Sequence, residues 1–375
     1  MTAAFLLAGR RTPIGRRGGV LADEHVGDLL AGTMVTAVDA AGVEPADVDQ
    51  VIVGCVTKTG DQANNVARTA WLSAGLPQEV PGVTVDAKCG SSQQAVHYAA
   101  ALVTSGAVDV VLCGGIEHMS RHPLGEDIGD GMGDAYSPAY RSHYEVTSQG
   151  EAAERIADLW GLDRARCDQI AVASQERAAA AVATGRFDCE ISPVGGVETD
   201  QGPRPSTLES LGRLQPVFRP EGVLTPGNSS QISDGASCVV VASDAYVRTH
   251  GLAPLAEIEH QQLVGVDPVL KLTGPIPATQ RILKRADIPV SGIDTFEVNE
   301  AFASVLGAWL ADIDVPLEAV NVNGGAIALG HPVGATGTRL LLTAAHELRL
   351  RGKQRALVTM CCGGGLGTAT VLRAA

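Results

Sequence analysis

Two segments far apart in the chain repeat one order of secondary-structure elements. The first reads as an apolar strand over residues 82–85, a glycine-containing turn, a helix over 93–106 and a strand over 108–115. The second, around His331, reads as a strand, a glycine turn, a helix over 336–352 and a strand over 355–365. Each unit predicts a strand–helix–strand crossover between parallel strands. Two such halves facing each other would bring two helix N-termini to one point, so the repeat predicts an α/β fold with a site between the halves.

Size and composition are consistent with this prediction. A chain of 375 residues is too long for one ordinary core, which favours two or three domains. Hydrophobic residues make up 45% of the chain but aromatic residues only 3%, so the core must be packed from Ala, Val, Leu and Ile. Such a composition is typical of helices layered against sheets.

Cys89 lies where the first repeat turns from strand to helix, in the segment VDAKCGSSQQAVHYAA at 85–100. A thiol there faces the unpaired backbone N–H groups and the positive end of the helix, which lower a cysteine pKa. We therefore expect Cys89 to be a nucleophile at neutral pH. The alternative is a small buried cysteine at the end of a strand.

A second polar motif, EVNEAFA at 297–303, places Asn299 and Glu300 between an apolar strand and a helix. Polar groups at the C-terminal end of a strand commonly line the active site of a sheet protein. The alternative for these two residues is a helix cap followed by a first-turn acid.

Two glycine-rich motifs follow near the C-terminus. GHPVGATG at 330–337 holds His331 in a rigid turn before a helix, where it could be a general base, an oxyanion donor or a structural histidine. ALVTMCCGGGLGTATVL at 356–372 predicts a tight hairpin with a thiol next to its turn.

Together these motifs resemble the thiolase family, in which four short motifs surround one reaction centre. The four are present in order as Cys89-Gly90-Ser91, Asn299-Glu300-Ala301-Phe302, Gly330-His331-Pro332 and Cys361-Cys362-Gly363. Supporting matches at 10–19, 114–120 and 224–237 extend the resemblance over essentially the whole chain.

The resemblance implies the thiolase fold, in which two similar α/β halves stack as five layers, αβαβα, with an inserted loop domain. The N-terminal half would comprise residues 1–117 and 224–250, the loop domain 118–223, and the C-terminal half 251–375. In this family the loop domain covers bound coenzyme A. The alternative for 118–223 is a solvated insertion, because irregular polar stretches there alternate with two helical patterns.

The same resemblance implies an acyl-CoA C-acyltransferase that cleaves 3-ketoacyl-CoA to acetyl-CoA and a shortened acyl-CoA, through an acetyl-cysteine intermediate on Cys89. His331 would activate the thiol and donate to the thioester oxygen, helped by a water on Asn299. Cys361 would shuttle a proton at the alpha carbon. The backbone N–H groups of Cys89 and Gly363 would form a second oxyanion hole.

The adjacent thiols Cys361 and Cys362 need a choice. Side chains alternate across a strand, so only one of the two can point into a site on one face. Counted from the three following glycines, the family's catalytic thiol matches Cys361, and we therefore assign the role to Cys361.

Coenzyme A is expected as a co-substrate and not as a permanently bound cofactor. Ser230 matches a family position near the pantetheine and Arg204 one near the nucleotide, with a solvated arginine as the alternative for Arg204.

Gln149 and Phe302 are expected in the acyl pocket. Short-chain biosynthetic thiolases carry a methionine that packs against the acyl group at the position matching Gln149. An amide there disfavours a bare methyl group because the amide needs a hydrogen-bond partner. We therefore expect degradation of 3-ketoacyl-CoAs larger than acetoacetyl-CoA, such as bulky, branched or ring-derived ones.

Charge and cysteine content narrow the partners. A net charge of −14 argues against nucleic acid or an anionic membrane as a partner. No apolar run is long enough for a membrane span, and the N-terminus lacks the order of a signal peptide. The eight cysteines show no metal spacing, which favours free thiols, a reducing cytoplasm and no metal. The resemblance adds a homodimer or homotetramer.

Three other functions are weighed against this one. A biosynthetic thiolase would condense two acetyl-CoA molecules to acetoacetyl-CoA. A non-catalytic acyl-CoA-binding relative usually lacks part of the motif set that this chain carries. A decarboxylating condensing enzyme of the ketoacyl synthase type uses a cysteine with two histidines, and the NEAF motif argues against that type.

Overall fold

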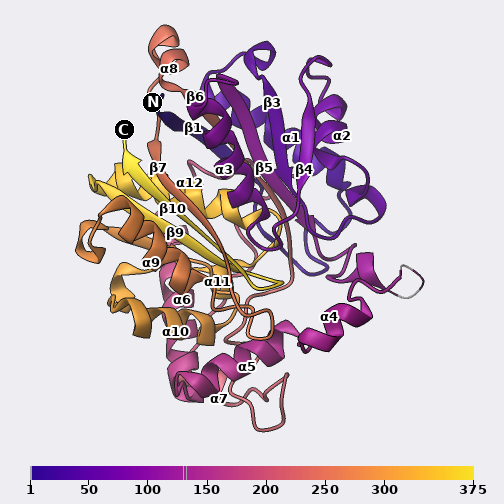
Figure 1. The fold of residues 1–375 in the computed structure, drawn as a ribbon, viewed down its shortest axis with the longest axis vertical. Helices are drawn as coiled ribbons and strands as arrows, with labels where there is room; N and C mark the ends of the chain where they lie inside the picture. Colours follow the sequence, from indigo (N-terminus) through magenta and orange to yellow (C-terminus); the bar gives the residue numbers. More distant parts are fainter. Residues whose placement is uncertain (1, 130, 132) are drawn as a thin grey trace.

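The computed structural model describes residues 2–129, 131 and 133–375. In this part of the chain, ten strands form one continuous β-sheet (Figure 1). The strands are β1 (Ala4–Arg11), β2 (Gly15–Arg16), β3 (Gln50–Gly54), β4 (Gly82–Val85), β5 (Val110–His118), β6 (Ser233–Ser243), β7 (Ala256–Gly265), β8 (Thr295–Val298), β9 (Arg355–Cys362) and β10 (Leu366–Ala374). Their order is β4-β3-β5-β6-β1-β7-β10-β9-β8, with β2 beside β6.

The sheet consists of two halves in which the strands follow the same order. Strand β3 runs parallel to β4 and β5, and β8 runs parallel to β9. The antiparallel pairs β5–β6 and β6–β1 of the first half correspond to β9–β10 and β10–β7 of the second. The predicted repeat of two α/β halves is confirmed. Two residue pairs between β1 and β7 join the halves into one continuous sheet.

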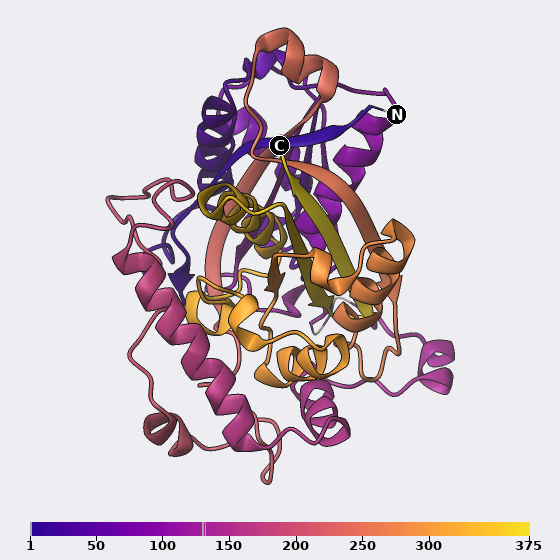
Figure 2. The same ribbon diagram turned by 90° about the vertical axis from the view of Figure 1, so that its left-hand side faces the viewer.

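Helices cover both faces of each half (Figures 1 and 2). The helices are α1 (Val26–Ala41), α2 (Val66–Ser73), α3 (Ser91–Thr104), α4 (Pro138–His143), α5 (Gln149–Leu159), α6 (Arg164–Ala183), α7 (Leu208–Gly212), α8 (Asp244–His250), α9 (Pro275–Ala286), α10 (Ala303–Ile313), α11 (Ala326–Leu329) and α12 (Thr336–Arg351). Helices α1 and α2 pack on the outer face of the first half, and α9 and α10 cover the second. Helices α3 and α12 lie between the halves, so the expected five layers are present.

The two central helices, α3 and α12, pack against each other and meet near their N-termini. A side chain at Gly337 would clash with the backbone N of Gln93. The N–H of Thr338 donates to Ser92 Oγ at 3.0 Å. Only glycine at position 337 permits this approach, which places the N-terminal ends of both crossover helices at one point, as the repeat predicts.

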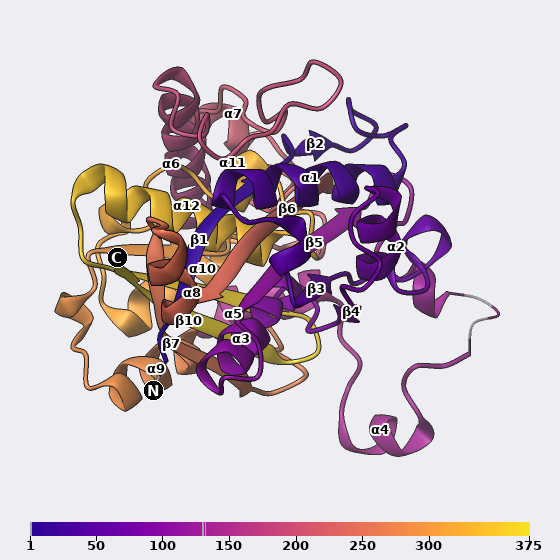
Figure 3. The ribbon, with the colours of Figure 1, turned by 90° about the horizontal axis from the view of Figure 1, so that it is seen from above.

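The segment between β5 and β6 leaves the sheet and carries α4 to α7. Helices α5 and α6 pack against α10 and share its apolar core, so this segment is more than a solvated insertion. Helix α4 lies on an arm that projects from the body (Figure 3). Of the predicted loop domain at 118–223, positions 130 and 132 lie outside the described residues.

Arg11 of β1 ties this segment to the first half. Its guanidinium donates to both carboxylate oxygens of Asp200, at 2.7 and 3.0 Å, and to Glu190 Oε2 at 3.0 Å. Arg11 and Glu190 are each 1% exposed, and Asp200 is also buried. Removing one partner from a buried ion pair leaves an uncompensated charge that is expensive to bury.

We expect Arg11→Met to lower the free energy of unfolding by about 3–5 kcal/mol, because Glu190 and Asp200 would lose their shared counter-charge. Urea denaturation followed by circular dichroism measures the change. Arg17→Met is the matched control: Arg17 is exposed, and its replacement should change stability by less than about 0.5 kcal/mol. Equal stability of the Arg11→Met and Arg17→Met variants would contradict this role.

Candidate active site

The turn that carries Cys89 joins β4 to α3 and is shaped by side chains. Lys88 has a positive φ of 52°, which is uncommon for a residue other than glycine. Ser91 Oγ accepts the N–H of Ala87 at 2.9 Å and donates to the carbonyl of Lys88 at 2.5 Å. Asp86 Oδ1 accepts the N–H of Lys88 at 2.7 Å. These contacts hold Cys89 at the start of α3, where it is 4% exposed.

Burial controls the acidity of this thiol. It raises the pKa of Cys89 to about 11, although the backbone N–H groups of Gly363 and of Cys89 itself hydrogen-bond to the sulfur and lower it. The expectation of a lowered pKa at the helix end was therefore wrong. The two halves exclude water from the sulfur. The loss of hydration destabilises a thiolate more than the hydrogen bonds from the two N–H groups stabilise it.

His331 is oriented by its neighbours in the turn before α12. Its Nδ1 lies 2.7 Å from Thr336 Oγ1, whose own proton goes to the carbonyl of Pro332 at 2.9 Å. Nδ1 must therefore be the protonated nitrogen, which leaves a lone pair on Nε2. Burial, helped by the positive charge of Arg339, lowers the pKa of His331 to about 3. The site therefore holds a neutral imidazole with Nε2 free to accept a proton.

Asn299 stands beside this free nitrogen, with Nδ2 lying 3.3 Å from His331 Nε2. The backbone N–H of Asn299 donates to the carbonyl of Thr359 on β9 at 3.0 Å, which fixes Asn299 at the end of β8. Its Oδ1 is buried and has no hydrogen-bond partner among the described residues. A buried polar atom of this kind is usually satisfied by a ligand or an ordered water.

Glu300 has a structural role beside Asn299. Its carboxylate accepts Ser174 Oγ at 2.6 Å, Asn321 Nδ2 at 2.8 Å and the N–H of Ile327 at 3.2 Å. These bonds fix α6, the loop at Asn321 and the start of α11 against the end of β8. With its oxygens occupied, Glu300 positions neighbouring groups.

Glu117 was missed by sequence reasoning, and it holds the turn of His331 in place. Its buried carboxylate accepts the N–H groups of Val56, Thr57 and Gly334, at 3.0 to 3.1 Å, and Gln62 Nε2 at 3.0 Å. The loop after β3 is thereby joined to the GHPVG turn. The available signal was a single acid inside the apolar strand VVLCGGIEH of β5.

Cys361 and Cys362 lie on opposite faces of β9. Cys361 packs in the apolar cluster that contains Phe302 and α10, whereas Cys362 packs in the cluster that contains Cys89. A Cβ at Gly90 would lie 2.7 Å from Cys362 Sγ, so the start of α3 rests directly on this sulfur. Burial, together with the nearby Cys89, raises the pKa of both thiols above the ordinary range.

The remaining predicted residues surround the hairpin of Gly363 and the NEAF segment. A Cβ at Gly363 would lie 3.3 Å from Gln149 Nε2, which places this amide at the hairpin. Phe302 is buried and meets Phe218 edge to face, with ring centroids 5.6 Å apart. The N–H of Ser230 donates to the carbonyl of Ala301 at 2.9 Å, next to Phe302.

Arg204 lies apart from these residues, in the loop before α7. Its side chain makes only long contacts, to the carbonyls of Gly202 at 3.5 Å and Pro226 at 3.4 Å. It borders a cleft of about 590 Å³ between α6 and residues 199–207. The structure therefore brings Cys89 and Gln149 to Gly363 and His331 to Asn299, whereas Arg204 lies apart from both groups.

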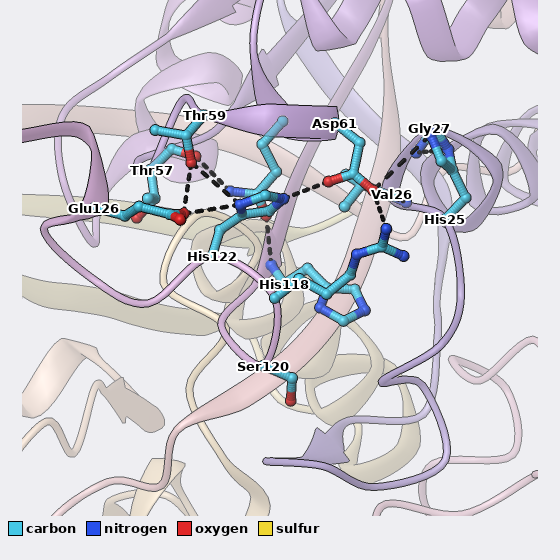
Figure 4. A network of polar contacts seen from close by, with 12 residues as sticks. His25, Val26, Gly27, Thr57, Thr59, Asp61, His118, Ser120, His122 and Glu126 are labelled. Carbon is cyan, nitrogen blue, oxygen red and sulfur yellow. Dashed lines mark hydrogen bonds and ion pairs between the residues drawn. The ribbon is translucent and has the colours of Figure 1, made fainter.

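A polar cluster holds the beginning of the segment between β5 and β6 in place (Figure 4). It consists of Thr59, Asp61, Arg121, His122 and Glu126. His122 Nε2 contacts Asp61 Oδ1, and His122 Nδ1 lies 2.9 Å from Glu126 Oε2. Burial alone would raise the pKa of Asp61, but the contacts with His122, Arg121 and the N–H of Val26 lower it. The cluster thus fixes residues 121–126 to the loop after β3.

Several classes of site are not seen in the described part of the chain. None of its helices is both long and apolar enough to cross a bilayer. Residues 2–129, 131 and 133–375 contain no group of three or more His, Cys, Asp or Glu side chains placed to hold a metal ion. All eight cysteines are free thiols.

We expect the rate at which iodoacetamide alkylates Cys89 to rise steadily from about pH 7 toward pH 11, because the reactive thiolate fraction grows until the pH passes a pKa of about 11. Peptide mapping of timed samples gives the rate at Cys89 itself, with Cys89→Ala defining the background. A rate that levels off below about pH 8 would mean that the thiolate is already formed and would contradict a neutral site.

Known proteins that resemble this chain in sequence and structure are thiolases. Residues 4–245 match the family model of the thiolase N-terminal domain, and residues 252–374 that of the thiolase C-terminal domain. A steroid 3-ketoacyl-CoA thiolase of Mycobacterium tuberculosis is 45% identical, over 99% of this chain and 94% of that protein. A beta-ketoadipyl-CoA thiolase of Pseudomonas aeruginosa is 40% identical, over 98% of each chain.

A solved structure of human mitochondrial 3-ketoacyl-CoA thiolase in complex with CoA superposes with a TM-score of 0.91 at 36% identity, covering 100% of this chain and 98% of that one. Both domain models, the curated relatives and the superposition cover nearly the whole chain. The chain therefore belongs to the thiolase family and is an acetyl-CoA C-acyltransferase.

Proposed function

We propose that this enzyme works in the degradative direction, cleaving 3-ketoacyl-CoA with free coenzyme A to give acetyl-CoA and a shortened acyl-CoA. The observation that carries the thiolase chemistry, in either direction, is the environment of Cys89: the N–H groups of Gly363 and Cys89 converge on its sulfur. Such a pair of donors stabilises the oxygen of an acyl group under attack. The alternative direction, condensation of two acetyl-CoA molecules, would use the same residues.

The first half-reaction begins when His331 Nε2 takes the proton of Cys89, and the thiolate attacks the 3-keto carbon. The N–H groups of Cys89 and Gly363 hold the oxygen of that carbon. The bond between the alpha carbon and the keto carbon breaks, and its electrons pass to the thioester oxygen, which His331 and a water on Asn299 stabilise. Cys361 then protonates the alpha carbon, and acetyl-CoA leaves.

The atom balance corrects the expected intermediate. The group left on Cys89 is the shortened acyl group of the substrate, and it is an acetyl group only when the substrate is acetoacetyl-CoA. In the second half-reaction, the Cys361 thiolate takes the proton of a new coenzyme A thiol, which attacks the acyl group. The departing Cys89 sulfur regains its proton from His331, so both groups return to their starting states.

The choice of Cys361 over Cys362 is supported by what encloses each sulfur. The Cys362 sulfur lies against Gly90, whose N–H it accepts, and contacts Thr368, so it is part of the support beneath α3. Cys361 has no such contact from α3 and lies on the face toward Phe302. We therefore propose Cys361 as the proton shuttle.

For coenzyme A, we propose that residues 118–223 form the covering loop domain between halves at 1–117 plus 224–250 and 251–375. Ser230 would contact the pantetheine, because its backbone is bonded to Ala301 beside the NEAF segment. Arg204 would contact the nucleotide. Its guanidinium has no carboxylate partner among the described residues, which leaves its charge available to a phosphate.

We propose a homodimer or homotetramer as the working form, in a reducing cytoplasm. Strand β4 ends the sheet, and its Val83 is 38% exposed next to Tyr98 of α3, which is 48% exposed. An edge strand with exposed apolar neighbours commonly pairs with another chain.

We propose that the preferred substrates are larger than acetoacetyl-CoA. Gln149 is only partly buried at the hairpin of Gly363, and its side chain makes no hydrogen bond with the described residues, so its amide is available to an oxygen of the acyl chain. The steroid and beta-ketoadipyl relatives carry names of acyl groups larger than acetoacetyl.

The function is tested by initial rates of coenzyme A-dependent cleavage across a panel of 3-ketoacyl-CoAs that includes acetoacetyl-CoA. We expect cleavage of several members, with cleavage of larger chains exceeding that of acetoacetyl-CoA in kcat/KM. Absence of cleavage with every member, while acyl-CoA is still bound, would indicate the non-catalytic alternative. Rapid condensation of acetyl-CoA with a tenfold preference for acetoacetyl-CoA, about 1.4 kcal/mol, would favour the biosynthetic alternative.

Replacement of the two adjacent thiols separates their roles. We expect Cys361→Ala to slow exchange of the acetyl methyl protons by about a hundredfold or more, since the proton shuttle is lost, while acylation of Cys89 continues. Cys362→Ala should affect that exchange by less than about tenfold, because it removes only a packed sulfur. Deuterium exchange into acetyl-CoA measures both variants. A larger loss in Cys362→Ala would reverse the assignment.

The role of Gln149 is tested in the Gln149→Met variant. We expect the ratio of kcat/KM for a large oxygenated 3-ketoacyl-CoA to that for acetoacetyl-CoA to fall by about fivefold, because about 1 kcal/mol of hydrogen bonding is replaced by an apolar wall. Gln50→Met, at the half-buried first residue of β3, is the matched control. An unchanged ratio in Gln149→Met would remove Gln149 from the acyl pocket.

A further inference from the structure

Lys88, the residue before the nucleophile, has a charged group that the mechanism does not use. Its Nζ lies 3.0 Å from Asp86 Oδ2, and its side chain is 44% exposed. Asp86 also accepts the backbone N–H of Lys88, so the aspartate has a structural reason to be present. An ammonium carries three N–H donors, and Asp86 uses one of them. Two donors remain for another partner.

The base of the Lys88 side chain lies at the acyl end of the site, within reach of its own ammonium group. A Cβ at Gly363 would lie 3.6 Å from both Cβ and Cγ of Lys88, and 3.3 Å from Gln149 Nε2. The stem of Lys88 and the amide of Gln149 therefore border the same space beside Gly363. The N–H of Gly363 points to the sulfur of Cys89, so an acyl group on that sulfur lies next to this space.

We propose that Lys88, together with Gln149, binds a carboxylate at the far end of the acyl chain, and that the preferred substrates are 3-ketoacyl-CoAs with a terminal carboxylate. This inference rests on the proposed thiolytic function and names its substrate class. The acyl group that stays on Cys89 would then be a half-thioester of a dicarboxylic acid.

The chemistry of the two side chains favours an anion over a neutral chain. Gln149 presents N–H donors to the space beside Gly363, and the ammonium of Lys88 reaches this space by rotation about its stem; a plain hydrocarbon end would offer these donors no partner. A carboxylate accepts from both, and its hydrogen bond to an ammonium is charge-assisted. The flexible four-carbon stem of lysine lets Nζ adjust to the end of the chain while its base stays fixed on Gly363.

The protein as a whole gives little help to an anionic substrate. The net charge of −14 disfavours a free carboxylate in general, so its binding requires a local cation. Lys88 supplies that cation one residue from the reacting sulfur. Asp86 opposes it, and the carboxylate of the substrate must share the ammonium with Asp86.

The test uses two substrates with the same six-carbon backbone, 3-oxohexanoyl-CoA and 3-oxoadipyl-CoA, in which a carboxylate replaces the terminal methyl group. The readout is the ratio of kcat/KM for the carboxylated to the uncharged substrate. General damage to the turn of Cys89 enters both values and cancels in this ratio. We expect the wild type to favour the carboxylated substrate by about tenfold or more, the effect of one charge-assisted hydrogen bond.

Four variants sharpen the result. Lys88→Met should lower the ratio by about tenfold, and Lys88→Arg should restore most of it. Asp86→Asn keeps an oxygen for the N–H of Lys88 but removes the competing charge, so the ratio should rise. Lys353→Met removes a lysine that lies 3.9 Å from Asp294, in the loop after α12, and should leave the ratio unchanged. Added salt should lower the wild-type ratio but not that of Lys88→Met.

Equal ratios in wild type and Lys88→Met, with both substrates cleaved, would overturn this inference and leave the proposed function standing, since Lys88 would then serve only the turn. A rise of the ratio in Lys88→Met would also overturn it. Cleavage of neither substrate by the wild type would overturn the proposed function, and the substrate class with it.

Discussion

The close packing of α3 against α12 is the constraint on which the rest of the structure depends. Gly337 lets the two helices meet, and the bond from Thr338 to Ser92 fixes their register. Because each helix begins in a catalytic turn, this contact sets where the thiol and the imidazole stand relative to each other. Glu117 adds a second tie, since its carboxylate holds the GHPVG turn against the loop after β3.

The enclosure that results explains why Cys89 and His331, the two proposed catalytic groups, are neutral at rest. Burial raises the pKa of Cys89 and lowers that of His331, so the thiol keeps its proton and the imidazole is unprotonated. In the proposed mechanism, charge forms only when substrate is bound and the proton moves from the thiol to the imidazole. Backbone N–H groups are suited to such a site, because they are fixed in place before the charge develops and need no reorganisation.

Most of the fold and of the candidate site could be predicted from the sequence, because short local motifs specify the strands, helices and turns concerned. The apolar run before Cys89, the helix after His331 and the hairpin at Cys361 each form from neighbouring residues, and their repetition predicted two facing halves. The acidity of Cys89 was predicted with the wrong sign, since burial of its sulfur depends on the packing of segments far apart in the chain. Glu117 was missed for the same reason, because its partners come from two loops far apart in the chain, the loop after β3 and the GHPVG turn.

The central claim is that Cys89 carries the covalent acyl group, and trapping the intermediate tests it most directly. The protein is incubated with acetyl-CoA, quenched in acid, digested and examined by mass spectrometry. The account predicts one acetyl group on the peptide that contains Cys89 and none on that peptide in Cys89→Ala. Acetylation confined to Cys361 or Cys362, with Cys89 unmodified, would contradict it.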